Sequence, residues 1–139
     1  MQLVCLSCGE INRIDPHDVE VGMPCKHCRK ALITGEARSI SDDQLAAIIK
    51  NHQTPVLVDF WAPWCAPCRA MASTVSAVAK HTATSHLCVK LNTDDYPTVA
   101  TKHRVKSLPS LVLFNRRKEV ARLTGTQGQK QILKWLEKY

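Results

Sequence analysis

Aromatic residues, long apolar runs and an export signal are scarce or absent in this sequence of 139 residues. Phe, Trp and Tyr together make up 5% of it, and none of them occurs before Phe60. No apolar run approaches the roughly 18 residues that a membrane-spanning helix needs, which argues against a membrane protein. The segment Met1–Cys5 has neither a basic start nor a long apolar stretch. We therefore expect no secretory signal and a cytoplasmic protein.

Cysteine, by contrast, is abundant. Seven cysteines in a chain that we do not expect to be exported indicate metal binding or redox catalysis rather than a disulfide framework. Hydrophobic residues make up 45% and charged residues 22%, close to the averages of folded domains, so extensive disorder is not expected. The length allows one ordinary domain, or one domain with a small appendage.

The net charge of +7 is unevenly distributed. Residues 1–35 hold four basic and four acidic side chains, whereas residues 102–139 hold ten basic and two acidic ones, a balance of +8. Such a basic end could suggest nucleic acid or an acidic partner. Charge runs are more often solvated faces, however, so we expect no nucleic-acid partner.

Four cysteines form two C-x-x-C pairs near the N-terminus, Cys5–Cys8 and Cys25–Cys28, separated by sixteen residues. This spacing matches a common zinc pattern. Two cysteines three apart on a tight turn can both reach one ion, and two such turns complete a tetrahedron of thiolates around Zn²⁺. Gly9 follows the first pair, where such a turn often needs a positive φ. The sequence therefore predicts one four-cysteine zinc site.

Other interpretations of this segment remain open. Either pair could be a redox dithiol, although neither lies between a strand pattern and a helix pattern, where such a thiolate is activated. His17 or His27 could replace a cysteine ligand, although four cysteines already saturate the ion. A nucleic-acid-binding zinc ribbon would need stacking aromatics and a basic groove, which this segment lacks. A segment this short cannot build an adequate core alone, so we expect the metal to supply its folding energy.

The rest of the chain alternates strand and helix patterns, which predicts an α/β domain with a partly parallel sheet. Ser41-Asp42-Asp43-Gln44 is typical of a capping box at a helix start. We divide the chain into a zinc module, residues 1–35, and a second domain, residues 36–139. The expected strands cover residues 36–40, 55–61, 87–91, 110–114 and 119–123, and helices are expected from Ser41, from Cys65, over 96–103 and over 129–138.

A third C-x-x-C, Cys65–Cys68, lies where the apolar strand pattern of residues 55–61 passes into a helix pattern. This placement is typical of a redox dithiol. Cys65 at the helix N-terminus would have its thiolate stabilised by the dipole and by free N–H groups. Cys68 would lie one turn later, pointing inward and close enough to form a disulfide. Pro67 costs little in a first helical turn, where its missing N–H is not needed.

At these residues the chain resembles the thioredoxin family, over about residues 36–139. The resemblance implies a thioredoxin fold, a central mixed sheet flanked by helices. It rests on several separate motifs: Trp64-Cys65-Ala66-Pro67-Cys68 around the redox pair, Asp59 as the buried aspartate, Lys90 as its neighbouring lysine, Ser107-Leu108-Pro109-Ser110 as the cis-proline loop, and Gly125 as the groove glycine. With its four-cysteine head, the whole chain is similar to the zinc-containing thioredoxin-2 group of bacteria.

The resemblance implies a protein-disulfide reductase that works through a redox-active Cys65–Cys68 disulfide. It assigns catalytic roles to Cys65, Cys68, Asp59, Lys90 and Pro109, and substrate contacts to Trp64, Ala66, Pro67, Leu108 and Gly125. The implied partners are protein disulfides and an NADPH-linked flavoprotein thioredoxin reductase. No bound organic cofactor is implied beyond the one Zn²⁺, and we expect a monomer. Two alternatives stay open: a thiol oxidase or disulfide isomerase, and a zinc-dependent binding or chaperone module.

The sequence departs from the family pattern at several positions. Ala66 stands where the family usually has Gly, which could change the reduction potential of the disulfide. Ser73 replaces a proline that kinks the active-site helix, so the kink is not predicted. Arg116-Arg117 replaces the usual Asn-Gly of a hairpin turn and leaves the turn type open. Cys88 lies in an apolar strand pattern and is expected to be inert core.

Overall fold

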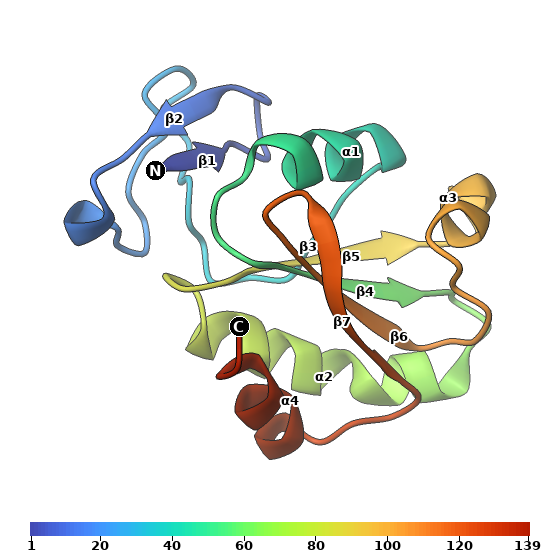
Figure 1. Cartoon of the computed structure of the whole chain (residues 1–139). Helices are drawn as coiled ribbons and strands as arrows, with labels where there is room; N and C mark the ends of the chain where they lie inside the picture. The colour runs from blue at the N-terminus through green and yellow to red at the C-terminus, as the bar shows by residue number, and fades with distance from the viewer.

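The computed structural model describes residues 1–139 and contains a five-stranded sheet, four α-helices and a small N-terminal head (Figure 1). The large sheet has the order β3-β5-β4-β6-β7. Its strands are β3 (Arg38–Ser39), β4 (Val56–Trp61), β5 (Leu87–Asn92), β6 (Ser110–Asn115) and β7 (Lys118–Thr124). β3, β5 and β4 run parallel, whereas β6 and β7 are antiparallel to their neighbours. The prediction of a mixed sheet with one hairpin is confirmed.

β4 is the central strand, and its position follows from its composition. Five consecutive residues, Val56–Phe60, are buried, because helices cover both faces of the strand. Four of them are apolar, and Asp59 is the exception. β4 ends at the segment that carries Cys65, so the central, buried strand of the sheet positions the dithiol.

The helices form two layers, one on each face of the sheet (Figure 1). α1 (Asp42–Asn51) and α3 (Pro97–Lys102) cover one face, and α2 (Ala66–His81) and α4 (Gln129–Leu136) cover the other. The predicted capping box is present, because Ser41 Oγ accepts from the N–H of Gln44 at 3.1 Å and Gln44 Oε1 accepts from the N–H of Ser41 at 2.9 Å. The last helix ends two residues earlier than expected. None of the helices combines the length and hydrophobicity needed to span a bilayer.

The head holds two short strands that the sequence patterns did not predict. β1 (Gln2–Val4) and β2 (Ile11–Arg13) pair antiparallel, and a 3-10 turn, η1 (Pro16–Asp18), comes next in the chain. Three residues are too few to show the alternation of apolar and polar side chains that indicates a strand, so the sequence does not predict these two strands. The expected strand at 36–40 is likewise reduced to the two residues of β3.

The head packs against the face of α1 rather than standing apart. Val4 and Leu6 belong to the same buried cluster as Leu45 and Ile48 of α1. The backbone of Gln2 is tied to Gln53, whose Oε1 accepts the Gln2 N–H at 2.7 Å and whose N–H donates to the Gln2 carbonyl at 2.9 Å.

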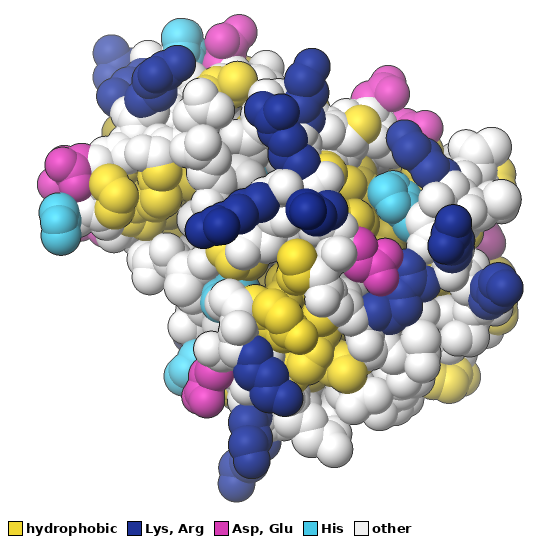
Figure 2. All heavy atoms as spheres, in the orientation of Figure 1, with side chains coloured by type: hydrophobic (Ala, Val, Ile, Leu, Met, Phe, Trp, Pro, Cys, Tyr) yellow, Lys and Arg dark blue, Asp and Glu magenta, His cyan; other side chains and the backbone are white.

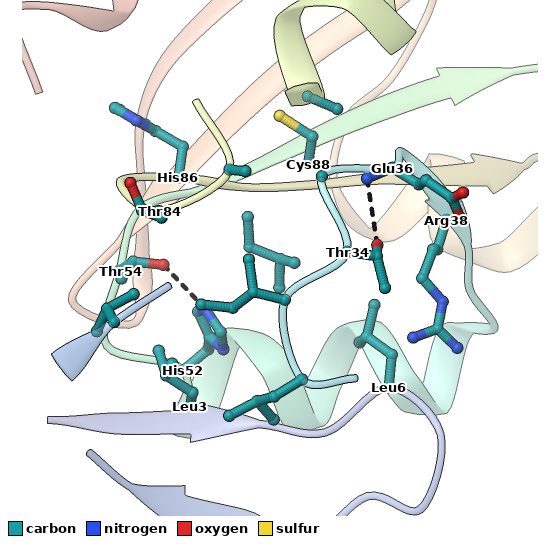
Figure 3. Close-up of a pocket in the computed structure, with 17 residues that line it drawn as sticks. Leu3, Leu6, Thr34, Glu36, Arg38, His52, Thr54, Thr84, His86 and Cys88 are labelled. Carbon is teal, nitrogen blue, oxygen red and sulfur yellow. Dashed lines mark hydrogen bonds between the residues drawn. The ribbon is translucent and has the colours of Figure 1, made fainter. Parts of the chain in front are cut away.

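His52 adds to this contact between the head and α1, which we call the seam (Figure 3). Its Nδ1 accepts the backbone N–H of Val4 at 3.1 Å, and its Nε2 lies 2.9 Å from Thr54 Oγ1. Burial lowers the pKa of His52 to about 4, which keeps the ring neutral so that Nδ1 can accept. Apolar packing and hydrogen bonds to backbone groups therefore join the head to α1 and to the segment that follows it.

Candidate active site and metal centre

Cys65 and Cys68 form a disulfide at the start of α2. Cys65 is the N-cap residue, and its Sγ accepts the N–H of Cys68 at 3.2 Å. This is the position that the sequence predicts, where the helix dipole favours a negative sulfur. Pro67 lies in the first turn. Both cysteines are buried, at 4% exposure, while Ala66 and Pro67 between them are exposed.

Asp59 is a buried carboxylate on β4 with no ion pair, and its Oδ1 lacks any hydrogen-bond partner. Burial raises its pKa to about 6, and the positive charge of Lys90 only partly offsets that rise. Lys90 is the register partner of Asp59 on β5, and its Nζ lies 5.0 Å from the ring centroid of Trp61. The arrangement leaves Asp59 able to hold or release a proton near neutral pH.

The loop before β6 carries the predicted cis peptide bond, Leu108–Pro109. Leu108 packs against the cluster that contains Cys65 and Cys68, which brings this loop to the dithiol. Gly125 has a φ of 82° and donates its N–H to the carbonyl of Pro109 at 2.9 Å. The cis-proline, Leu108 and Gly125 therefore form one hydrogen-bonded edge beside the disulfide.

Trp64 is the most exposed large apolar residue, at 69% exposure, and it immediately precedes Cys65. Its indole Nε1 donates to Oδ1 of Asp94 at 3.0 Å. Asp94 could not be singled out from the sequence, because it lies thirty residues away on the loop after β5 and no local spacing connects it to Trp64. The role of Arg69 could not be predicted from the sequence either. Its side chain donates a hydrogen bond to the carbonyl of Pro63 and so holds the segment before the dithiol in place.

The four cysteines of the head converge on one point. Their Sγ atoms all lie within 4.8 Å of one another, and the Cys5–Cys28 and Cys8–Cys25 pairs are each 3.7 Å apart. Four sulfurs about 2.3 Å from a central Zn²⁺ would be about 3.8 Å apart in a regular tetrahedron. The donor set and its spacing therefore fit a tetrahedral thiolate-bound metal. His17 and His27 are exposed and lie outside this group, as expected.

The two C-x-x-C turns of the head have the same construction. The residue after each pair, Gly9 or Arg29, has a positive φ of 82° or 69°. Its N–H returns to the carbonyl of the first cysteine, at 2.8 Å for Gly9 to Cys5 and 3.0 Å for Arg29 to Cys25. The need for a glycine-like conformation after the first pair is confirmed, and the second turn meets the same need with an arginine.

Asn12 on β2 supports the four-cysteine cluster, although no pattern in the sequence indicated this role. It is 1% exposed; its Nδ2 donates to Cys25 Sγ at 3.3 Å, and its Oδ1 accepts from the N–H of Lys26 at 2.8 Å. Burial opposes ionisation of Cys25, but hydrogen bonds from backbone N–H groups and from Asn12 outweigh it and lower its pKa to about 6. Such donors orient a metal-binding thiolate and stabilise its charge.

Cys88 belongs to neither group. It is buried in the cluster between the sheet, α2 and α4, and burial raises its pKa to about 11. The interpretation of Cys88 as inert core agrees with this environment.

Comparison with known proteins gives a consistent result. The Thioredoxin family model matches residues 36–138. The chain is 35% identical to thioredoxin C-3 of Corynebacterium nephridii over 137 residues, covering 99% of this chain and 94% of that protein. It is 37% identical to a chloroplastic M-type thioredoxin of Chlamydomonas reinhardtii, covering 80% of this chain and 79% of that protein.

Solved structures agree with the sequence matches. The crystal structure of chloroplastic thioredoxin z aligns with a TM-score of 0.68 at 27% identity, covering 74% of this chain and 93% of that one. A mutant thioredoxin of Halobacterium salinarum gives the same TM-score at 26% identity, covering 76% of this chain and 91% of that one. The N-capped dithiol, the buried aspartate and the cis-proline edge thus lie in a fold shared with these proteins, and the chain belongs to the thioredoxin family of thiol–disulfide oxidoreductases.

Proposed function

We propose that this protein reduces protein disulfides in the cytoplasm through the Cys65–Cys68 pair. The observation that supports this most is the position of Cys65, which is the N-cap of α2 and lies in one cluster with Leu108 of the cis-proline loop. An N-capping sulfur is favoured as a thiolate, the nucleophilic form. A cis-proline edge beside it offers backbone groups to an extended substrate chain.

In the proposed reaction, the thiolate of Cys65 attacks one sulfur of the substrate disulfide. A mixed disulfide forms and the other substrate sulfur leaves as a thiolate, which takes up a proton. Cys68 then loses its proton to Asp59, directly or through water, and attacks Sγ of Cys65. This second attack releases the reduced substrate and leaves Cys65–Cys68 oxidised. The two electrons taken from the dithiol are thereby transferred to the substrate.

The remaining residues have supporting roles in this proposal. Lys90 tunes the pKa of Asp59, since its charge is the one that opposes the effect of burial. The exposed indole of Trp64, held by Asp94, forms the substrate surface together with Ala66 and Pro67. The cis-proline loop and Gly125 complete that surface on the other side of the disulfide.

We propose that the head binds one Zn²⁺ through Cys5, Cys8, Cys25 and Cys28, and that the chain is a zinc-containing thioredoxin of the thioredoxin-2 type. The match to thioredoxin C-3 supports this, because it extends over 99% of the chain and therefore includes the head. When bound, the ion supplies a cross-link that stabilises a segment with a five-residue buried core. The head, residues 1–35, and the catalytic domain, residues 36–139, are then separate in chemistry although packed together.

We further propose that an NADPH-linked flavoprotein reductase regenerates the dithiol, and that the protein acts as a monomer. The direct test is reduction of insulin disulfides by the zinc-loaded protein with NADPH and a thioredoxin reductase. Turnover in the wild type, its loss in Cys65→Ser and its retention in Cys88→Ala are expected. Absence of turnover in the wild type would contradict the proposal. A reduction potential near that of strong thiol oxidants would instead favour the oxidase function.

A further inference from the structure

The turn between β6 and β7 places two arginines in an unfavourable backbone conformation. Arg116 and Arg117 have φ values of 52° and 71°. Two consecutive residues with positive φ form the tight hairpin turn that glycine and asparagine adopt most readily. Side chains with a Cβ, such as arginine, are disfavoured there. Two consecutive arginines at positions that favour glycine and asparagine raise the question of what else their side chains do.

These arginines border a hollow of about 430 Å³. Lys50, at the end of α1, contributes a third positive charge. The hollow has three side-chain amides, those of Gln2, Asn51 and Gln53, and no carboxylate in its lining. Figure 2 shows Lys and Arg side chains over the C-terminal end of α1 and the β6–β7 turn, as well as elsewhere on this face.

The positive charges of this hollow are not neutralised within the protein. The Nε–H of Arg117 donates to the carbonyl of Lys50 at 3.1 Å, which covers one of the carbonyls at the negative end of α1. No other hydrogen bond involves the side chains of Arg116, Arg117 or Lys50. The nearest acidic residue in the sequence, Glu119, is already paired with Arg122 at 2.7 Å. Several guanidinium N–H groups and one ammonium are therefore available for an anion.

We propose that this hollow binds the diphosphate group of a small phosphorylated ligand. Guanidinium groups pair with phosphate oxygens through two parallel hydrogen bonds, and the three side-chain cations match the charge of a diphosphate. Met1 also lines the hollow, but its terminal ammonium already donates to the carbonyl of Ile14 at 2.7 Å. Side-chain amides add neutral donors. The lining lacks Phe, Tyr and Trp, and its one histidine ring, that of His52, is engaged in the seam with the head. The absence of a stacking platform disfavours single-stranded nucleic acid as the occupant.

The position of the hollow separates it from the catalytic chemistry. Val56 of β4 pairs with Phe114 beside the turn, whereas the opposite end of β4 leads to Cys65. A strand of six residues spans about 20 Å, so a bound diphosphate would not contact the dithiol. Gln2 belongs to β1 of the head, so the ligand would contact both the head and the catalytic domain. We therefore expect the ligand to stabilise the packing of the head against the catalytic domain, or to bind only when the head is packed there. We do not expect it to be a substrate of the dithiol.

The test measures binding of inorganic pyrophosphate to the full-length, zinc-loaded protein by calorimetry, at constant ionic strength and with zinc content checked before and after. The double variant Arg116→Asn/Arg117→Gly removes two charges and gives the turn its favoured residues. It should bind pyrophosphate at least tenfold more weakly, with thermal stability equal to or above that of the wild type. A matched variant, Lys130→Gln/Lys134→Gln on α4, removes the same charge elsewhere and should bind within twofold of the wild type. Insulin reduction should be equal in all three.

Three results would overturn this assignment. Equal loss of binding in both double variants would show that pyrophosphate binding depends only on the net charge of the protein. Tighter binding of a single-stranded oligonucleotide or of an oligoglutamate peptide than of pyrophosphate would assign the surface to a polyanion or an acidic protein. Failure of the wild type to bind pyrophosphate would also overturn the assignment, but because insulin reduction is measured separately, it would leave the proposed reductase function intact.

Discussion

Three C-x-x-C motifs of identical spacing occur in this chain, and the structure gives them two different geometries. In the head, each motif is a turn closed by a residue with positive φ, and the two turns bring four sulfurs to within 4.8 Å of one another. At Cys65–Cys68 the motif begins a helix, the first sulfur caps it, and the two cysteines form a disulfide with each other. The cysteine spacing is the same, so the backbone around it decides the chemistry.

The two geometries diverge in the backbone after the second cysteine. Gly9 and Arg29 turn the chain back, so each turn offers both sulfurs in one direction and needs a second turn as partner. At the third motif the chain runs on as helix α2, which has Cys65 as its N-cap residue and holds Cys68 in its first turn. A buried carboxylate, Asp59, lies on β4, the strand that leads to this motif, whereas no carboxylate belongs to the sulfur cluster of the head.

The largest expected effect comes from replacing one cysteine in each kind of motif. Cys68→Ser should retain attack by Cys65 but lose resolution, so it should trap a mixed disulfide with insulin and lose essentially all turnover. Cys8→Ser should keep the turnover of the wild type within about twofold and lose tight zinc binding, since a ligand is missing. Electrophoresis without reductant and zinc analysis measure the two outcomes. Turnover lost in Cys8→Ser while the protein remains folded would remove the distinction between the motifs.

Removing the head should cost stability without abolishing the reaction. A protein beginning at Glu36 loses the packing of Val4 and Leu6 on α1, which at about 1.5–3 kcal/mol for each buried side chain amounts to about 3–6 kcal/mol. Its free energy of unfolding in urea should fall by several kcal/mol, while the folded fraction still reduces insulin.

The full-length double variant Val4→Ala/Leu6→Ala tests the contribution of this packing while the four head cysteines stay in place. It should lose a similar part of the stability and keep full turnover. Unchanged stability in the double variant would show that the seam contributes nothing to the fold. A folded but inactive truncated protein would instead make the head part of the catalytic unit.

Asp59→Asn should change stability in the opposite direction. Burial raises the pKa of Asp59 from 3.8 to about 6, so the folded state favours the protonated form and is penalised once the carboxyl ionises. The penalty is absent below pH 4, grows as the pH rises to about 6 and is constant above that. The asparagine variant of the oxidised protein should therefore be more stable at pH 8 by up to about 3 kcal/mol, and equal to the wild type at pH 4.

The same substitution removes the proposed proton acceptor, so disulfide reduction at pH 7 should slow by about tenfold or more. Asp95→Asn, at an exposed carboxylate, is the matched control and should change neither property. Urea titrations at several pH values and the insulin assay provide both readouts. A stability gain that persists unchanged at pH 4 would show that the buried charge is not its cause.

Asn12→Ala should weaken the metal site without affecting catalysis. The substitution removes a donor to Cys25 Sγ and an acceptor for the Lys26 N–H, and losses of such supporting contacts typically reduce metal affinity by about 10–100-fold. Competition with a chromogenic chelator measures the affinity, and insulin reduction should stay at the wild-type rate. Asn115→Ala, at the end of β6, serves as the control and should keep the affinity for zinc.

Features that depend on neighbouring residues were predictable from the sequence. The capping box at Ser41 and Gln44, the buried run of β4 and the helix start after Cys65 all follow from patterns within a few positions. Contacts between distant segments were not predictable, because spacing carries no information about them. The Trp64–Asp94 hydrogen bond belongs to this class.

The head shows the same limit more clearly. Its cysteine spacing predicts four converging sulfurs, but Asn12 and the seam residue His52 act through contacts made only after β1 and β2 fold and dock. The type of the turn at Arg116 and Arg117 is not predictable for a different reason, since arginines rarely adopt the backbone conformation found there.

The claim that one spacing supports two chemistries is tested most directly by competitive alkylation of the reduced, zinc-loaded protein, with each cysteine quantified by mass spectrometry across a pH series. Cys65 should react fastest and with a pKa well below the ordinary value of about 8.5, Cys68 should react more slowly, and the four head cysteines should react only after a chelator removes the zinc. Alkylation of Cys5, Cys8, Cys25 and Cys28 at the rate of Cys65 with zinc present, or of Cys68 before Cys65, would contradict it.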